Sequence, residues 1–300
     1  MDEYKKIIKS KNLRYGILFG VRFIPDSVML KLQYRVKFKR KLNLKFPKRF
    51  TEKIQWYKLY YKNSIMPKCS DKYLVREYIK SKGLGYILND LYCVYDSPSE
   101  IKLDELPDKF VMKLSNGSGT NLLCRDKNKL NEQQVIKQFK SFYFKVKANL
   151  GREWPYIKVK SKIVVERLLE DEEHINNAIN DYKIFCYNGQ PEYIICISDR
   201  YSEQCNHLVY DTEWNKIMVA SEKARIDENL PKPENLKEML CIASKLSEDF
   251  PFARIDLYSL ENKVYFGEIT FYPWSGYMEF EPDEFDYILG EKFVLTKNKE

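Results

Sequence analysis

Histidine is scarce in this sequence: His174 and His207 are the only two among 300 residues. They stand far apart in polar segments, so the sequence predicts neither a Ser-His-Asp or Cys-His catalytic centre nor a histidine-rich metal site. The seven cysteines are odd in number and include no Cys-x-x-Cys pair. Most have apolar neighbours, which favours reduced thiols in a cytoplasmic protein over a disulfide framework or a zinc site.

Long hydrophobic runs are also missing. The most apolar early window, residues 15–25, is interrupted by Arg22 and is shorter than the ~20 residues needed to cross a bilayer. No secretory signal is visible. Residues 7–37 mix aliphatic and basic side chains. This pattern suits packing on the main body, which we favour, or peripheral contact with the anionic inner face of a membrane.

Positive charge is concentrated near the N-terminus. The net charge is +8, and residues 1–50 carry most of the excess. Such a region suits a nucleic acid, an acidic bilayer or an acidic polymer, and a solvated basic face explains it equally well. We expect no nucleic acid, because neither a reading motif nor an aromatic stacking platform accompanies the basic residues. The cluster comprises Arg35, Lys37, Lys39, Arg40, Lys41, Lys45, Lys48 and Arg49.

Hydrophobic periodicity mixes helices with hairpins. It predicts helices at residues 51–63, 71–82, 129–148 and 234–247. Residues 86–96 are expected to be a strand-rich connection, and Asn188-Gly189 is a strong hairpin signal. Without a regular βαβ alternation, this mixture predicts the α+β class. Further strands are expected at residues 110–113, 163–166, 182–187, 192–197, 252–258 and 264–271.

Two triplets in apolar surroundings concentrate polar groups: Arg254-Ile255-Asp256 and Glu268-Ile269-Thr270. In a strand, residues two apart point to one face, so Arg254 and Asp256 project together, as do Glu268 and Thr270. The polar segment 259–263 between them predicts a hairpin turn. Two close carboxylates are costly unless a cation lies between them. Oxygen ligands indicate Mg²⁺, and Mg²⁺ beside an arginine indicates nucleotide phosphates.

Three further segments fit a nucleotide site. Lys113 precedes the loop Ser115-Asn116-Gly117-Ser118-Gly119, whose backbone N–H groups suit phosphates, although an ordinary turn explains the loop equally well. Asp181 and Lys183 share a strand face, which suits a ribose and a phosphate, or a cross-strand ion pair. The segment Glu166-Arg167-Leu168-Leu169 suits an adenine edge or simply ends a strand.

The order of these segments resembles the ATP-grasp superfamily, in which two α+β subdomains hold ATP between them. More closely, the chain resembles the TupA-like branch, named for teichuronopeptide biosynthesis. The resemblance covers roughly residues 30–290. It rests on the phrases Phe50-Thr51-Glu52-Lys53-Ile54-Gln55-Trp56, Asp71-Lys72-Tyr73-x-Val75-Arg76, Lys113-x-x-Asn116-Gly117-Ser118-Gly119, Gly151-Arg152-Glu153-Trp154-Pro155-Tyr156, Asp181-Tyr182-Lys183-x-Phe185-Cys186-x-Asn188-Gly189, Ser198-Asp199-Arg200, Phe250-Pro251-Phe252-x-Arg254-x-Asp256-Leu257-Tyr258 and Gly267-Glu268-x-Thr270.

The resemblance implies a site for ATP and Mg²⁺. Asp256 and Glu268 would bind one or two Mg²⁺ ions, and Thr270 stands where the superfamily has Asn, which makes it the weaker third ligand. Arg254 would stabilise the transferring phosphoryl group, with Lys183 beside it. The remaining nucleotide contacts would be Lys72 and Lys113 to the phosphates, residues 115–119 as the mobile loop over them, residues 166–169 as the adenine hinge, Asp181 to the ribose and Lys183 to a phosphate.

The activity implied is carboxylate–amine ligation through an acyl-phosphate, in bacterial cell-surface polysaccharide biosynthesis such as capsule or teichuronopeptide. An amino acid or amine would be joined to a uronic-acid sugar. Arg152 and Arg200 would grip the anionic acceptor, or form structural ion pairs. The alternatives are a kinase-like transfer to a sugar hydroxyl and a non-catalytic or glycosyltransferase-associated protein. The expected parts are a basic helical extension (1–50), a preceding part (51–109), a small subdomain (110–190), a large subdomain (191–292) and a tail (293–300).

Overall fold

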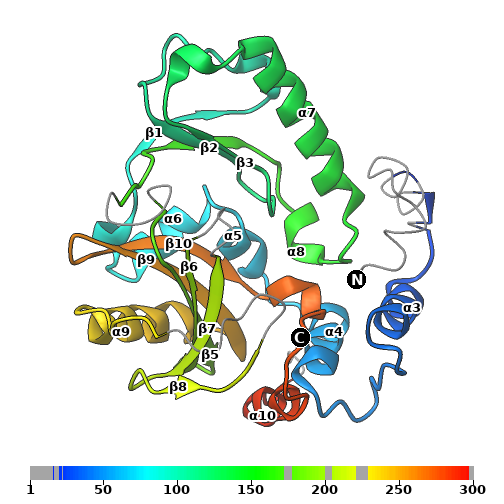
Figure 1. Cartoon of the computed structure of the whole chain (residues 1–300). Coiled ribbons are helices and arrows are strands. Elements are labelled where there is room, and N and C mark those ends of the chain that lie inside the picture. The colour runs from blue at the N-terminus through cyan, green and yellow to red at the C-terminus, as the bar shows by residue number, and fades with distance from the viewer. Residues whose placement is uncertain are drawn as a thin grey trace.

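The computed structural model describes residues 16, 20, 21, 23–171, 178–199, 205–220 and 229–296. Within these ranges the chain forms two antiparallel sheets with helices around both (Figure 1). One sheet has four strands in the order β1-β4-β2-β3, and the other has six in the order β10-β9-β5-β6-β7-β8. This arrangement confirms the predicted α+β class.

The four-stranded sheet packs one face against the long helix α7. Along β2 the side chains alternate, so Met112 and Leu114 enter the core under α7 while Lys113 faces the other side. The helix is capped at its start by Asn131, whose side chain accepts a hydrogen bond from the backbone N–H of Gln134. The elements of this unit are β1 (Leu91–Tyr95), β2 (Phe110–Leu114), β3 (Asn121–Cys124), β4 (Ile163–Glu166) and α7 (Glu132–Ala148).

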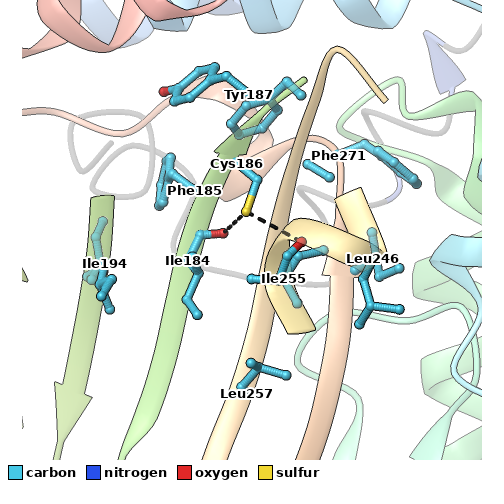
Figure 2. Close-up of a cluster of buried hydrophobic side chains, with 14 of the residues drawn as sticks. Ile184, Phe185, Cys186, Tyr187, Ile194, Leu246, Ile255, Leu257 and Phe271 are labelled. Atoms are coloured by element: carbon cyan, nitrogen blue, oxygen red, sulfur yellow. Dashed lines mark hydrogen bonds between the residues drawn. The ribbon is translucent and has the colours of Figure 1, made fainter. Parts of the chain in front are cut away.

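The six-stranded sheet has α9 on one face. Figure 2 shows Ile184 and Cys186 among the buried side chains here, with Cys186 Sγ 3.8 Å from the carbonyl oxygen of Ala243 in α9. Alternation sends Lys183 and Phe185 to the opposite face. The elements are β5 (Asp181–Tyr187), β6 (Gln190–Ser198), β7 (Asn206–Asp211), β8 (Lys216–Ile217), β9 (Phe252–Leu260), β10 (Lys263–Thr270) and α9 (Leu236–Ser247).

That opposite face divides into an aromatic end and a polar end. At the aromatic end, Phe50 packs on Phe185 and Phe252, with ring centroids 5.8 and 5.1 Å apart. Lys183 and Asp256 lie towards the other end of the same strands, paired in register. The aromatic contacts therefore hold β5 and β9 in place at one end, and the same two strands carry Lys183 and Asp256 at the other end.

The remaining helices lie beside the sheets, and both α3 and α10 pack against α4 (Figure 1). Helix 51–63 was expected and is observed as α4. The expected helix 71–82 is observed as α6, which begins at Val75 after a turn in which the Asp71 side chain accepts from the backbone N–H groups of Tyr73 and Leu74. The expected segment 86–96 holds η1 and β1. The helices are α3 (Asp26–Phe38), α4 (Phe50–Tyr60), α5 (Met66–Ser70), α6 (Val75–Ser81), α8 (Trp154–Ile157) and α10 (Glu284–Lys292), and the 3-10 turns are η1 (Gly85–Ile87), η2 (Pro98–Glu100), η3 (Lys127–Lys129) and η5 (Pro273–Gly276).

Two details differ from the sequence-based expectations. The turn between β9 and β10 is not a five-residue segment: Leu260 pairs with Lys263, and Glu261 and Asn262 both have positive φ, as in a two-residue type I′ turn. The expected boundary at residues 190 and 191 falls beside the β5–β6 turn. Because β5 pairs with both β6 and β9, we propose instead that the subdomains divide between β4 and β5.

The seven cysteines are free thiols. Among the residues that the structure describes, no helix is both long and apolar enough to cross a membrane.

Candidate active site

The β9–β10 hairpin brings the two triplets face to face. Arg254 pairs with Thr270 and Asp256 with Glu268, and a bulge at Gly267 interrupts the ladder just before Glu268. A Cβ atom at Gly267 would lie 2.9 Å from the carbonyl oxygen of Asp256, so only glycine fits this close approach without a shift. The predicted grouping of these four side chains is therefore what the structure shows.

Three oxygen ligands converge on one cationic group. Arg254 Nη2 lies 2.7 Å from Asp256 Oδ2, 3.2 Å from Glu268 Oε1 and 3.1 Å from Thr270 Oγ1. Arg254, Asp256 and Thr270 are buried, whereas Glu268 is partly exposed. Two carboxylates and a hydroxyl around one positive group are a donor set that fits Mg²⁺.

Lys183 adds a second cation from the neighbouring strand β5. Its Nζ lies 2.5 Å from Asp256 Oδ2 and 2.8 Å from Asp181 Oδ2. The predicted shared face of Asp181 and Lys183 is thus present, and so is the ion pair that we gave as its alternative. Burial raises the pKa of Asp256, although Arg254 and Lys183 oppose this shift.

Lys72 connects this hairpin to the loop that follows β2. Its Nζ lies 3.5 Å from Glu268 Oε2 and donates a hydrogen bond to the carbonyl oxygen of Gly117 at 2.9 Å, while its backbone N–H donates to Ser115 O at 2.8 Å. Burial would raise the pKa of Glu268, but Lys72 and Arg254 outweigh it and lower this pKa to about 2. Glu268 is therefore ionised at neutral pH.

The loop of residues 115–119 is held from several sides. Ser115 Oγ accepts from the backbone N–H of Lys162, and Asn116 Nδ2 donates to the carbonyl oxygen of Tyr156 at 2.7 Å. A Cβ atom at Gly117 would lie 2.3 Å from Thr120 Oγ1, and Gly119 has a φ of +60°. Lys145 Nζ donates to Ser118 O at 2.6 Å. The glycines are thus required by the loop conformation itself.

A cavity of about 110 Å³ lies between the two sheets. Glu166 ends β4 at its edge and accepts from Lys113 Nζ at 2.9 Å and from Arg76 Nη1 at 3.2 Å. The backbone N–H of Arg167 donates to Asp90 O. The predicted hinge residues and Lys113 meet in this one space, whose lining mixes apolar and polar side chains: Asn89, Val111, Lys113, Asn121, Leu123, Arg125, Glu166, Arg167, Leu168, Leu169, Ala178, Ile179, Tyr258 and Phe266.

Arg152, one of the two predicted acceptor-binding arginines, contacts the N-terminal segment instead of this group. Arg152 donates from Nη1 to Ile24 O and Asp26 Oδ1 and from Nη2 to Val21 O, at 2.9–3.1 Å. Its guanidinium therefore anchors the N-terminal segment, which is the structural role we gave as the alternative. Arg200 lies outside the described residues.

Sequence reasoning missed a buried cluster behind the site. Lys58 is 1% exposed, and its Nζ donates to Ser275 O at 2.8 Å and to Ser275 Oγ at 3.0 Å. Ser275 Oγ in turn lies 2.5 Å from Glu153 Oε1. Burial lowers the pKa of Lys58 to about 8 and raises the pKa of Glu153, and each opposes the other's shift.

This cluster fixes the η5 loop beside Arg254. Trp274 and Ser275 both have left-handed backbone angles, with φ of 46° and 56°, a strained conformation for residues other than glycine. The Trp274 ring lies over the Arg254 guanidinium, 5.0 Å from centroid to Cζ. One feature of the sequence could have indicated this cluster: Lys58 lies in a predicted helix that has a broad apolar face.

Comparison with known proteins gives the chain a family. The solved structures that it resembles include D-alanine–D-alanine ligase from Bacillus anthracis (16% identity, TM-score 0.39, covering 68% of this chain and 57% of that one). Another is D-alanine–D-alanine ligase from Helicobacter pylori (15% identity, TM-score 0.41, covering 77% of this chain and 60% of that one). A third is a RiPP-associated ATP-grasp ligase from Chryseobacterium gregarium in complex with ADP and a leader and core peptide (15% identity, TM-score 0.39, covering 80% of this chain and 65% of that one).

The chain spans just over half the length of the first of these structures, 57%. No curated protein sequence matches the chain. The family model that matches is TupA-like ATPgrasp, over residues 52–294. The chain therefore belongs to the TupA-like ATP-grasp family.

Proposed function

We propose that the protein is an ATP-dependent ligase that joins a carboxylate to an amine through an acyl-phosphate. The observation that carries the proposal is the convergence of Asp256, Glu268 and Thr270 oxygens around Arg254 Nη2, beside Lys183, in a member of an ATP-grasp family. Among the described residues, no three His, Cys, Asp or Glu side chains gather as a metal site. Mg²⁺ commonly binds through one or two carboxylates together with substrate phosphates, and Asp256 and Glu268 offer two.

Under this proposal Asp256 and Glu268 hold Mg²⁺, with Thr270 as a weaker third ligand. The ion would neutralise charge on the ATP phosphates. The residues of the chain would position the nucleotide: Lys72, Lys113 and Lys183 at phosphates, Ser115, Asn116, Gly117, Ser118 and Gly119 over them, Asp181 at the ribose, and Glu166, Arg167, Leu168 and Leu169 along the adenine.

The reaction has two steps. An oxygen of the acceptor carboxylate forms a bond to the γ-phosphorus of ATP while the bond from that phosphorus to its bridging oxygen breaks, releasing ADP. The amine nitrogen then attacks the acyl carbon, phosphate leaves, and the nitrogen loses a proton. Such transfers depend on positioning and charge neutralisation, which Arg254 and Lys183 would provide; their ion pairs with Asp256 support this role.

We place this reaction in bacterial cell-surface polysaccharide biosynthesis, in the cytoplasm, with a uronic-acid sugar as acceptor and an amino acid or amine as donor of nitrogen. Membership of the TupA-like family supports this context. Exposed basic side chains outside the cavity between the sheets, among them Lys41 and Lys48, suit an anionic precursor.

The test measures ADP and free phosphate release from ATP with uronic-acid sugars, with and without a panel of amino acids, followed by mass analysis of the sugar. A ligase releases both products only when an amine is present, and the sugar gains an amide. Phosphate that stays on the sugar regardless of amine would reject ligation in favour of a sugar kinase.

Two matched variants test whether the protein is catalytic at all. Asp256→Asn and Glu268→Gln should abolish ADP release, because each removes a charge from the donor set. Glu261→Gln, on the exposed turn of the same hairpin, is the control and should keep wild-type activity. Unchanged biological function in the first two variants would support a non-catalytic role instead.

A further inference from the structure

The helix α3 buries one face and exposes another. Met29, Leu30 and Tyr34 are buried against the body of the protein. Val28, Leu32 and Val36 follow one another at four-residue spacing and are 53%, 55% and 48% exposed. Residues four apart share a helix face, so these three form an apolar stripe open to solvent.

Basic side chains are interleaved with this stripe. Lys31, Arg35 and Lys39 also follow at four-residue spacing and are exposed. In the part of the chain that the structure describes, neither Lys31 nor Arg35 makes a side-chain ion pair. Asp26, the acid in the first turn, lies 2.9 Å from Arg152 Nη1, so its charge is already compensated.

The structure separates the basic cluster of the sequence into two groups. Lys37 is paired with Glu279, and both Arg40 and Arg49 are paired with Asp283, so these cations fasten the N-terminal region to the C-terminal segment. Lys31 and Lys45 instead line a groove of about 480 Å³. Beside Lys45, Phe46 is 66% exposed.

The outer face of α3 and this groove form one surface, which we call the α3 face: Val28, Lys31, Leu32, Arg35, Val36, Lys39, Lys45 and Phe46. Figure 1 shows α3 at the edge of the molecule, beyond α4 and away from both sheets. A partner on this surface therefore leaves the cavity between the sheets open.

We propose that the α3 face binds an anionic lipid bilayer, with its cations at phosphate headgroups and its apolar side chains in the headgroup boundary. Charge complementarity selects an anionic partner. The apolar stripe selects a bilayer over an acidic polymer in water, because only the bilayer removes those side chains from water. This inference goes beyond the proposed ligase activity and does not depend on it.

The test is flotation of the full-length protein with vesicles of phosphatidylcholine alone or mixed with phosphatidylglycerol. The wild-type protein should float with the anionic vesicles and remain behind with the neutral ones. Lys31→Glu/Arg35→Glu should lower the partition coefficient by roughly 25-fold or more, because each basic side chain contributes about fivefold. Lys237→Glu/Lys245→Glu on the exposed side of α9 is the control, with the same charge change and wild-type binding expected.

A second variant tests the apolar stripe. Val28→Ser/Leu32→Ser/Val36→Ser keeps every charge and should also lose binding. Wild-type protein that ignores both vesicles, or binds both equally, overturns the proposal. The proposal is also overturned if the serine variant binds vesicles like the wild-type protein and soluble polyuronate competes for that binding, because these results would identify an acidic polymer as the partner. A third outcome against the proposal is a wild-type dimer that the serine substitutions convert to monomers, because the partner of the α3 face would then be a second copy of this chain. ATP turnover of the variants with a soluble acceptor reports the ligase proposal separately.

Discussion

Lys58 Nζ donates a hydrogen bond to the carbonyl oxygen of Ser275 at 2.8 Å and so ties α4 to the loop that carries Trp274 over Arg254. Gln55 Nε2 donates to the same carbonyl oxygen at 3.1 Å. The loop is therefore held from behind by two side chains of one helix. Its left-handed residues persist because these contacts offset their backbone strain.

Lys58→Met should loosen this loop. The substitution leaves Ser275 O with a weaker set of donors and removes the cation that lowers the pKa of Glu153, so we expect the free energy of unfolding to fall by about 1–3 kcal/mol. Because Trp274 lies over Arg254, the maximal rate of ADP release should fall more than the affinity for ATP. Urea unfolding and steady-state kinetics measure the two effects.

A double-mutant cycle provides the control for Lys58. Glu153→Gln removes the negative charge that faces Lys58, so the double variant with Lys58→Met should be more stable than the sum of the single effects predicts. Strict additivity would show that Lys58 and Glu153 do not interact across Ser275.

Gly267→Ala should destabilise the hairpin that holds the site. Its Cβ atom would meet Asp256 O at 2.9 Å, a backbone atom that cannot move without shifting β9, so we expect a cost of about 1–3 kcal/mol. Gly85→Ala is the matched control, because its Cβ atom would lie 3.5 Å from the flexible Lys80 side chain. Equal thermal unfolding midpoints for the two variants would contradict the close approach.

The two-residue period of strands made part of the site predictable. Arg254 and Asp256 alternate with Ile255, so a strand necessarily puts their side chains on one face. Lys58 was not predictable, because a lysine in an aromatic helix usually extends its ammonium to water, and only the folded η5 loop supplies the carbonyl that receives it. The same limit applies to Arg152, whose partners come from a segment 126 or more residues away in sequence.

Thr270 gives a direct test of the donor set. Thr270→Val removes the hydroxyl that lies 3.1 Å from Arg254 Nη2 and 3.0 Å from Glu268 Oε1. We expect the Mg²⁺ concentration for half-maximal ATP turnover to rise by about 10–100-fold, the usual effect of losing a group that orients metal ligands. Thr270→Asn restores an oxygen ligand and should stay within a few-fold of wild type. Unchanged Mg²⁺ dependence in Thr270→Val would remove Thr270 from the site.

The pKa of Glu268 predicts how acid weakens the metal-free protein. Its folded-state pKa of about 2 lies below the ordinary 4.5, so the unfolded chain binds more protons between these values. The stabilisation is complete above the unfolded pKa and is lost as the pH falls towards the folded one. In EDTA, the difference in unfolding free energy between wild type and Glu268→Gln should therefore shrink on acidification below about pH 5. Lys72→Met, which removes the first cation facing Glu268, should weaken this pH dependence, and parallel curves for all three proteins would contradict the ion pairing.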